Sequence, residues 1–557
     1  MEVLIPMIMK WMVDRGIQAG SMPDIWLYGG LLLAAAMVSL ASGVMSGRMA
    51  AVASAGFARN LRHDMYYRIQ DYSFSNIDKF STSSIITRLT TDVTNVQNSF
   101  QMILRMAVRA PLMIIFSLIS AMVINARISL VFVYTIPVLA VGIYLIMTRT
   151  HPIFKRVFQT YDKLNNVVQE NLRGVRVVKS FVREDYETDK FTGISGSICK
   201  DFISAEKRLA FMNPLMMGCV YTCTLLISWL GAKAIIASGN GEIVAGGMTT
   251  GDLTALISYV TQILGSLMMV SFTFLMITMS RASAQRIIEV LDEETDIVSP
   301  ENARTEIPDG SIDFDHVNFS YASRSERDTL SDIDLHIPSG SVVGILGGTG
   351  SGKSSLVQLI PRLYDVKDGS VKVGGIDTRE YDLTALRDSV AMVLQKNELF
   401  SGTIKDNLRW GNENATDEEL EEACRLAQAD PFIQDFPDKY DTWIEQGGTN
   451  VSGGQKQRLC IARALLKKPK ILILDDSTSA VDTKTDALIR AGFRSYIPDT
   501  TKLIIAQRVA SVKDADLIVV LDNGRIADAG THDELMARCA IYREVHDSQT
   551  KGGEEHE

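Results

Sequence analysis

The stretch Gly347-Gly348-Thr349-Gly350-Ser351-Gly352-Lys353-Ser354 fits the pattern G-x-x-x-x-G-K-[ST]. An apolar run, residues 342–346, precedes this stretch, and a helix-like run that begins at Ser355 follows it. This context is typical of a phosphate-binding loop, in which backbone N–H groups and a helix N-terminus face a polyphosphate. Lys353 would reach the outer phosphates and the Ser354 hydroxyl would bind Mg²⁺. The alternative is a Gly-rich turn between a strand and a helix, which the flanking runs disfavour.

The composition indicates several domains and membrane spans. Of the 557 residues, 46% are hydrophobic and 22% are charged, and the mean hydropathy is slightly positive. The formal net charge of -10 argues against nucleic acid as a partner, because nucleic-acid-binding proteins carry basic faces. The 6 cysteines lack the spacing of a zinc site or a disulfide framework, although Cys219 and Cys223 lie one turn apart. We therefore expect buried or reduced thiols.

Long intervals without a charged residue mark the expected membrane spans. They lie between residues 24 and 48, 127 and 149, 208 and 233, and 252 and 281, and each can cross roughly 30 Å of hydrocarbon as a helix. Residues 110–126 form a further span, which the apolar residues of 101–109 extend. The long loops at 48–101 and 149–208 are rich in Lys and Arg, so we expect them in the cytosol.

The first apolar run, residues 3–13, is interrupted by Lys10 and is too short to cross a membrane. We interpret it as the outer half of the first of six spans, with a start upstream of Met1. The alternatives are a signal peptide, which lacks its basic region here, and a protein with only five spans.

Arg105 and Arg109 lie one helical turn apart on the same face of the expected helix. One interpretation is a polar patch on a substrate path. The other, which we favour from the sequence, is a pair of arginines at a cytosolic helix end whose side chains extend into the headgroups.

A charged stretch with Pro300 and Pro308 separates the apolar half of the chain from the rest. We expect a transmembrane domain with long cytosolic helical loops at 1–298, a linker at 299–310 and an α/β domain at 311–557. Strand-like runs at 311–319, 341–346, 390–394, 471–474, 503–506 and 517–521 alternate with helical runs. This alternation indicates a largely parallel sheet.

Two further motifs suit phosphate chemistry. The apolar run 471–474 ends in Asp475 and Asp476, where a carboxylate at a strand's carboxyl end can hold Mg²⁺. The stretch Val451-Ser452-Gly453-Gly454-Gln455 precedes a helix-like run at 456–466, which makes a second candidate anion site at a helix N-terminus. A single protein seldom needs two such sites for one nucleotide.

These motifs resemble those of ATP-binding cassette (ABC) exporters, and the segment Ser479-Ala480-Val481-Asp482 follows them in that family's order. The resemblance covers nearly the whole chain. It implies a membrane all-α domain of the six-span exporter type, followed by an α/β P-loop NTPase. It also implies a dimer in which each ATP lies between one subunit's P-loop and the other subunit's signature, residues 451–455.

The resemblance also assigns individual roles. It implies that Tyr321 stacks on adenine, that Gln395 joins Ser354 and Asp475 in binding Mg²⁺, and that residues 479–482 form the D-loop. Residues near 73–91 and 174–183 would hold the two coupling helices that link the ATPase to the membrane spans.

Asp476 and Gln507 depart from the family pattern, which usually has Glu and His at these positions. Asp is shorter than Glu by about 1.5 Å, and a misplacement of about 1 Å can cost roughly a hundredfold in rate. Gln can donate a hydrogen bond to the γ-phosphate, but it cannot carry a proton as His can. The pattern resembles the subunit of bacterial heterodimeric multidrug ABC exporters that carries a weak ATP site.

We therefore expect a bacterial, multi-pass plasma-membrane half-transporter with its nucleotide-binding domain in the cytosol. Using ATP and Mg²⁺, it would export hydrophobic small molecules, drugs or lipids, with a second half-transporter as its partner and membrane lipid around it. One alternative is a homodimeric lipid or drug exporter with two slow sites. Another is a membrane receptor or channel that ATP gates.

Overall fold

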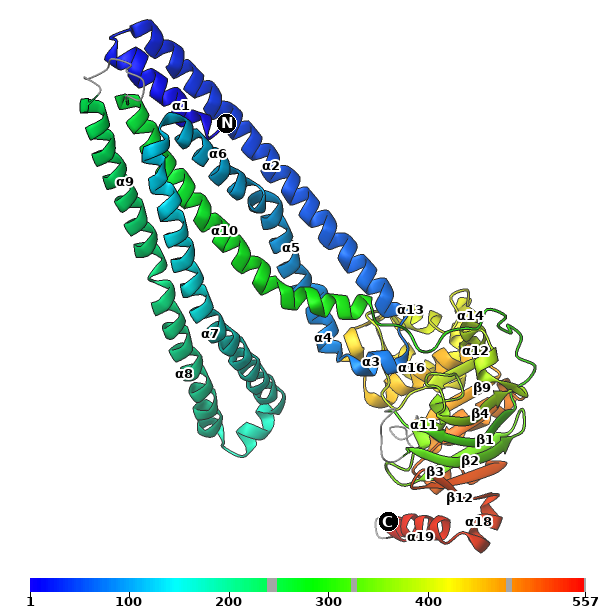
Figure 1. Cartoon of the computed structure of the whole chain (residues 1–557). Coiled ribbons are helices and arrows are strands. Elements are labelled where there is room, and N and C mark those ends of the chain that lie inside the picture. The colour runs from blue at the N-terminus through cyan, green and yellow to red at the C-terminus, as the bar shows by residue number, and fades with distance from the viewer. Residues whose placement is uncertain (238–247, 322–327, 477–482, 555–557) are drawn as a thin grey trace. The chain divides into compact units, whose positions relative to one another are not determined.

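The computed structural model describes residues 1–237, 248–321, 328–476 and 483–554 (Figure 1). Compact packing divides the chain into one unit of Met1–Gln70 and Ser83–Asp292 and another of Asp71–Thr82 and Glu293–Glu557. The domain boundaries expected at residues 298 and 310 remain predictions. A short segment of the first cytosolic loop, Asp71–Thr82, packs with the second unit and overlaps the residues near 73–91 that the resemblance assigns to a coupling helix.

The first unit consists of long helices (Figure 1). Among the described residues, 5 helices are long and apolar enough to cross a membrane: Met22–Gln70, Thr82–Ile124, Ala126–Ser180, Glu184–Ala237 and Thr250–Leu291. They confirm the spans expected from the intervals without charge. The elements of this unit are α1 (Leu4–Trp11), η1 (Met12–Gln18), α2 (Met22–Gln70), α4 (Thr82–Thr87), η2 (Arg88–Asp92), α5 (Val93–Met102), η3 (Ile103–Ala107), α6 (Arg109–Ile124), α7 (Ala126–Ser180), α8 (Glu184–Leu209), α9 (Met212–Ala237) and α10 (Thr250–Leu291).

Residues near the beginning of the chain form a helix despite their charges. The ammonium of Lys10 lies 2.6 Å from the carboxylate of Asp252, in the first turn of α10. Asp14 accepts hydrogen bonds from the Thr249 hydroxyl at 2.7 Å and from the Gly251 N–H at 2.8 Å. The Asp252 carboxylate therefore neutralises Lys10, and the N-terminus of α10 stabilises the anionic Asp14, as helix N-termini favour anions.

Helix ends in the first unit follow ordinary capping rules. The side chain of Asn125 caps α7 by accepting from the Ile128 N–H, and Thr249 caps α10 with a capping box to Asp252. The core of the unit is apolar and includes Phe132, Cys223 and Tyr259, all fully buried. It packs helices α6, α7, α9 and α10 against one another.

The second unit contains a mostly parallel sheet with the strand order β12-β11-β3-β10-β9-β6. Its strands are β3 (Val342–Gly347), β6 (Val390–Val393), β9 (Ile471–Asp475), β10 (Thr501–Ile505), β11 (Leu517–Asp522) and β12 (Arg525–Gly530). Only the edge pair β11 and β12 is antiparallel among these neighbours in the described chain. Every residue of β9 and β10 is buried, as in a sheet covered on both faces.

An antiparallel sheet with the order β2-β1-β4-β5 lies in the same unit. It comprises β1 (Ile312–Phe319), β2 (Leu330–Ile337), β4 (Asp368–Val373) and β5 (Ile376–Asp377), and β7 (Gly402–Thr403) pairs with β8 (Trp443–Ile444) elsewhere. The expectation that residues 311–319 belong to the parallel sheet is wrong. Their inward residues alternate with polar ones, which suits an antiparallel strand with one buried face.

Helices and a short cytosolic-loop element complete this unit. They are α3 (Phe74–Lys79), α11 (Lys353–Gln358), α12 (Leu383–Ser389), α13 (Ile404–Arg409), α14 (Asp417–Leu426), α15 (Asp430–Gln434), α16 (Gly453–Leu466), α17 (Thr483–Tyr496), α18 (His532–Arg538) and α19 (Ala540–Glu554). The carboxyl ends of β3, β9, β10 and β6 share one edge of the parallel sheet. In open parallel sheets such an edge is where ligands bind.

Candidate functional site

The phosphate-binding loop joins β3 to α11, as the sequence predicts. Gly350 and Gly352 have φ values of 81° and 95°, in the left-handed region that favours glycine. The ammonium of Lys353 donates to the carbonyls of Gly347 at 2.8 Å and Gly348 at 2.7 Å, so it lies over the loop. Burial lowers the pKa of Lys353, against the opposing effect of Asp475 and Asp476.

The oxygens expected to bind Mg²⁺ lie at the same edge of the sheet. Asp475 ends β9 and is buried, and its carboxylate is hydrogen-bonded to the Ser354 side chain. Burial raises the pKa of Asp475, although this hydrogen bond and Lys353 act in the opposite direction. The buried hydroxyl of Ser351 has no hydrogen-bond partner within the described part of the chain.

This donor set fits Mg²⁺. The ion prefers hard oxygen ligands and usually completes its shell with phosphate oxygens and water. Within the described residues, no group of three or more His, Cys, Asp or Glu side chains could hold a metal ion. The hydroxyl of Ser354 and the carboxylate of Asp475 would therefore hold the ion together with a nucleotide, whose charge it would neutralise.

Asp476 and Gln507 contact each other. The Gln507 amide Nε2 donates to Asp476 Oδ2 at 2.9 Å, and the same carboxylate is hydrogen-bonded to Gln395. Burial raises the pKa of Asp476, while the bonds from Gln507 and Gln395 lower it. The three side chains follow the neighbouring strands β6, β9 and β10, which explains why they meet.

The backbone of Asp476 is fixed as well. Its φ of 48° is left-handed, its N–H donates to the Ile505 carbonyl at 3.1 Å, and its carbonyl accepts from Gln457 at 3.4 Å. Asp is among the residues that tolerate this conformation best. The carboxylate is therefore aimed by the fold rather than free to turn.

Tyr321 stands beside the first turns of α11. Its hydroxyl lies 2.9 Å from the Ser355 hydroxyl and 3.1 Å from Gln358 Oε1. Its ring packs edge to face on Tyr364, with 5.0 Å between the ring centroids, and Tyr321 remains 49% exposed. An aromatic ring with an open face next to the phosphate-binding loop suits stacking on a base.

Tyr364 continues this contact toward the first cytosolic loop, and sequence reasoning did not identify it. Its hydroxyl donates to Asp78 of α3 at 2.6 Å, and its ring contacts Phe74. Burial and the hydrogen bond to Asp78 raise the pKa of Tyr364, so the hydroxyl remains a donor. α3 is also held by Lys79, whose ammonium lies 2.6 Å from Glu293.

The signature, residues 451–455, forms the N-terminus of α16. Ser452 caps this helix with a capping box, in which its own N–H donates to Gln455 Oε1 at 2.8 Å. A Cβ built at Gly453 would meet no atom within 4 Å. No hydrogen bond joins the signature to the P-loop among the residues that the structure describes. The proposed D-loop, residues 479–482, lies outside the described residues.

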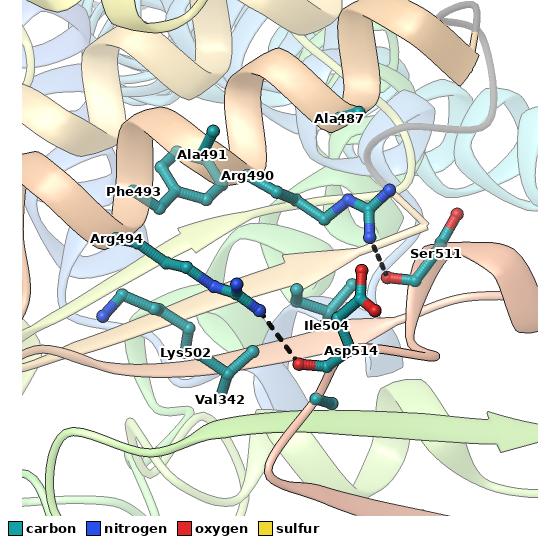
Figure 2. A pocket seen from close by; sticks show the side chains of 11 residues that line it. Val342, Ala487, Arg490, Ala491, Phe493, Arg494, Lys502, Ile504, Ser511 and Asp514 are labelled. Atoms are coloured by element: carbon teal, nitrogen blue, oxygen red, sulfur yellow. Dashed lines mark hydrogen bonds between the residues drawn. The ribbon is translucent and has the colours of Figure 1, made fainter. Parts of the chain in front are cut away.

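The segment after Gln507 is held by side chains that no sequence motif indicated. Gln549 of α19 donates to the Gln507 carbonyl at 2.8 Å and accepts from the Val509 N–H at 2.9 Å. From α17, Arg490 donates to the Ser511 carbonyl at 3.3 Å and Arg494 to the Asp514 carbonyl at 2.9 Å (Figure 2). These arginines line a cavity of about 260 Å³.

Comparisons with known proteins agree with this architecture. The family description "ABC transporter transmembrane region" matches residues 1–267, and "ABC transporter" matches residues 330–479. An uncharacterized ABC transporter ATP-binding protein, YfiB of Bacillus subtilis, is 36% identical over 98% of this chain and 94% of its own length.

Two further comparisons concern a named transporter and a solved fold. A fatty acid ABC transporter ATP-binding/permease protein of Mycobacterium tuberculosis is 32% identical over 87% of this chain and 75% of its own length. The solved structure of a bacterial Atm1-family ABC exporter with ATP bound has a TM-score of 0.83. It covers 98% of this chain and 95% of that chain at 24% identity, so it shows the fold alone.

Proposed function

The chain belongs to the ABC transporters, and on that basis we propose that it is one half of a heterodimeric exporter and carries its weak ATP site. Its cargo would be hydrophobic small molecules, drugs or lipids, moved across the plasma membrane. ATP binding would close two nucleotide-binding domains on each other, and hydrolysis at the partner's site would reset them.

The hydrogen bond between Gln507 and Asp476 is the observation that carries this proposal. A general base needs a free lone pair near the attacking water and a pKa suited to accepting its proton. The Asp476 Oδ2 already accepts a hydrogen bond from the Gln507 amide, which takes up one of its lone pairs and opposes the effect of burial, which raises the pKa of Asp476. Gln507 offers only N–H donors and a carbonyl, so it cannot relay a proton.

The contacts for binding ATP are nevertheless present. Lys353 lies over the loop, Ser354 and Asp475 provide oxygens for Mg²⁺, and Tyr321 offers an open ring face. A site with these contacts binds the nucleotide and hydrolyses it slowly. The open space beside Gly453 suits a signature that serves a nucleotide on another subunit.

One comparison and one structural observation bear on the cargo. A relative that is named for fatty acid transport matches most of this chain, which supports a lipid among the candidate substrates. The membrane helices carry many exposed apolar side chains, such as Leu33, Phe116 and Trp229. Such side chains suit contact with lipid and with hydrophobic cargo.

Hydrolysis by the isolated chain tests the proposal. We expect the purified full chain in lipid nanodiscs to bind a photoreactive ATP analogue with Mg²⁺ but to hydrolyse ATP slowly. Adding a second half-transporter that carries Glu and His at the positions matching Asp476 and Gln507 should raise the rate strongly. Brisk hydrolysis by the chain alone would instead support a homodimeric exporter. An ATP-dependent current in planar bilayers without substrate movement would support a gated channel.

A further inference from the structure

Arg105 and Arg109 lie inside a longer apolar span rather than at its ends. Residues Thr82–Ile124 form one candidate membrane span that contains both arginines, and the turn residue Val108 separates η3 from α6 within it. The interpretation of the two arginines as side chains that extend into the headgroups stays a prediction. Arg105 lies in the π-helix η3, and Arg109 is the first residue of α6. Short π-helical segments occur frequently at functional sites.

The depth of Arg109 follows from the length of α6. This helix has 16 residues and is capped off by the extended residue Asn125, which begins the short outer connection. With Asn125 taken as the outer edge of a hydrocarbon layer roughly 30 Å thick, a rise of about 1.5 Å per residue puts Arg109 about 24 Å from that edge. Arg105, one turn further, lies near the inner edge. The two guanidinium groups therefore bracket the inner boundary of the hydrocarbon.

Arg109 forms an ion pair at this depth. Its Nη2 lies 2.6 Å from Glu2 Oε1 and 2.7 Å from Glu2 Oε2, and the Ser39 hydroxyl lies 3.5 Å from Glu2 Oε1. The Nη1 and Nε groups of Arg109 donate to no described residue. Within the described part of the chain Arg105 forms no hydrogen bond or ion pair, and its side chain is exposed. Two sets of N–H donors therefore have no partner among the described residues.

Two side chains of α10 donate hydrogen bonds to the backbone at Glu2 and Val3. The side chain of Gln262 donates to the Glu2 carbonyl at 3.1 Å, and the hydroxyl of the fully buried Tyr259 donates to the Val3 carbonyl at 2.7 Å. Ser117 of α6 in turn donates to Gln262 Oε1 at 3.2 Å. α1 packs against α10 and α2 in this unit (Figure 1). The backbone that carries the Glu2 side chain is therefore held by α10.

An arginine inside hydrocarbon is costly, and such residues usually mark a binding site or a path. A purely structural ion pair would be stabilised by burial of both partners and by use of the other guanidinium donors. Here the Arg109 and Glu2 side chains are 51% and 35% exposed, and the remaining donors are open. The arrangement leaves room for a second anion on the same guanidinium.

We propose that Arg109 and Arg105 bind the anionic head group, a carboxylate or a phosphate ester, of a single-chain amphiphile from the inner leaflet. The inference rests on the proposed function, because it names the class of cargo. Arginine donors can bind such a group in bidentate fashion, and the chain of the amphiphile would lie along the apolar face of α6. Glu2 holds Arg109 between binding events and competes with the anion for it.

This competition predicts effects of opposite sign. Glu2→Gln removes the competing charge, so an anionic amphiphile should bind about fivefold more tightly. Arg109→Gln removes the main donor group, and binding should weaken by about tenfold or more. A pair that only ties α1 to α6 would respond alike to both changes. Arg127→Gln, which removes an exposed arginine at the outer end of α7, is the matched control and should change nothing.

The test is a competition assay with the full chain in phosphatidylcholine nanodiscs and without ATP. A fluorescently labelled fatty acid is displaced by palmitate, by palmitoyl lysophosphatidate or by hexadecanol. We expect both anions to compete and the alcohol to compete at least tenfold more weakly. Their relative affinities distinguish a carboxylate from a phosphate source. ATP-driven dye efflux from liposomes, measured separately, reports on the proposed function itself.

The inference is overturned if hexadecanol competes as well as palmitate, or if Glu2→Gln weakens binding as much as Arg109→Gln. It is also overturned if Arg127→Gln weakens binding as much as Arg109→Gln. Because the assay contains no ATP, failure of transport would leave these binding results unchanged. Circular dichroism and gel filtration identify any variant that fails to fold. If Arg109→Gln does not fold, Arg109→Lys replaces it. Arg109→Lys keeps the charge and should weaken palmitate binding less than the loss of the charge would.

Discussion

The Gln507 side-chain amide donates a hydrogen bond of 2.9 Å to the Asp476 carboxylate, so the two departures from the family pattern are in contact. A Glu at position 476 would reach further and crowd this amide. A His at position 507 could exchange a proton with the carboxylate or with a γ-phosphate, whereas Gln cannot. Asp476 and Gln507 are compatible in size and hydrogen bonding. Together they suit a site that holds a nucleotide.

Restoring only one of the two residues should restore little activity. Asp476→Glu should raise ATP hydrolysis by the purified chain at most about tenfold, because Gln507 still cannot relay a proton. The double change Asp476→Glu with Gln507→His should give a larger gain than the sum of the single changes, as expected for groups in contact. Steady-state phosphate release measures all three variants. Full activity from Asp476→Glu alone would contradict a defect shared by both residues.

The two hydrogen bonds that Gln549 forms with the segment after Gln507 lead to a separate prediction. Gln549→Ala removes the acceptor for the Val509 N–H and the donor to the Gln507 carbonyl, while Gln549 itself is exposed and its loss leaves no cavity. Amide exchange across residues 507–511 should rise about fivefold for a lost hydrogen bond of about 1 kcal/mol. Hydrogen–deuterium exchange with mass spectrometry measures this change.

Ser548→Ala is the control for this experiment. The Ser548 hydroxyl bonds only to the Val545 carbonyl within α19 among the described residues, so exchange near Gln507 should stay unchanged. Gln549→Glu keeps an acceptor but places an anion beside the Gln507 carbonyl, and it should behave like Gln549→Ala. Unaltered exchange in both Gln549 variants would show that the contact does not hold the segment.

The Tyr364 hydroxyl should stabilise the packing of α3 against local unfolding. Tyr364→Phe keeps the ring contacts with Tyr321 and Phe74 but loses the hydrogen bond to Asp78. A hydrogen bond to an exposed charged group is worth about 1 kcal/mol. Trypsin should then cleave after Lys79 about fivefold faster. Tyr66→Phe, at an exposed tyrosine on α2, should leave the cleavage rate as it is.

The parts of the fold that the sequence predicts are those with a local pattern. The P-loop has a fixed spacing of glycines, and the membrane spans are long intervals without charge, so each could be located without its neighbours. Strands β3, β9, β10 and β11 are continuous apolar runs, as buried parallel strands are. The antiparallel strands β2 and β4 contain no continuous apolar run and were not identified, although the similarly alternating β1 was.

Contacts between distant residues could not be predicted from local patterns. In the sequence, Lys10 interrupts an apolar run. Its ion pair with Asp252 of α10 is known only from the structure. Tyr364 and Gln549 belong to no motif, and their partners Asp78 and Gln507 are known only from the fold. The sequence shows that positions 476 and 507 carry Asp and Gln, but it does not show that the two side chains contact each other.

The final prediction compares two motifs of this one chain in the heterodimer. Lys353 serves the weak site, whereas Gly453 in the signature serves the ATP held on the partner's P-loop. Gly453→Asp should nearly silence ATPase and transport, because a carboxylate there repels phosphate and blocks the approach of the backbone. Loss of donors aimed at transition-state charge costs about a hundredfold or more. Lys353→Ala should leave a substantial fraction of both activities.

The structure indicates that Gly453→Asp does not disturb the fold of its own chain. A Cβ at Gly453 meets no atom of its own chain within 4 Å, so Gly453→Asp should fold normally and its effect should come from the dimer. Gly193→Asp, at an equally open glycine on α8, controls for the added charge. Steady-state ATPase of the heterodimer in liposomes measures the three variants. If Lys353→Ala is the most damaging, this chain carries the working site, because the loss of a phosphate contact then limits the turnover that both subunits share.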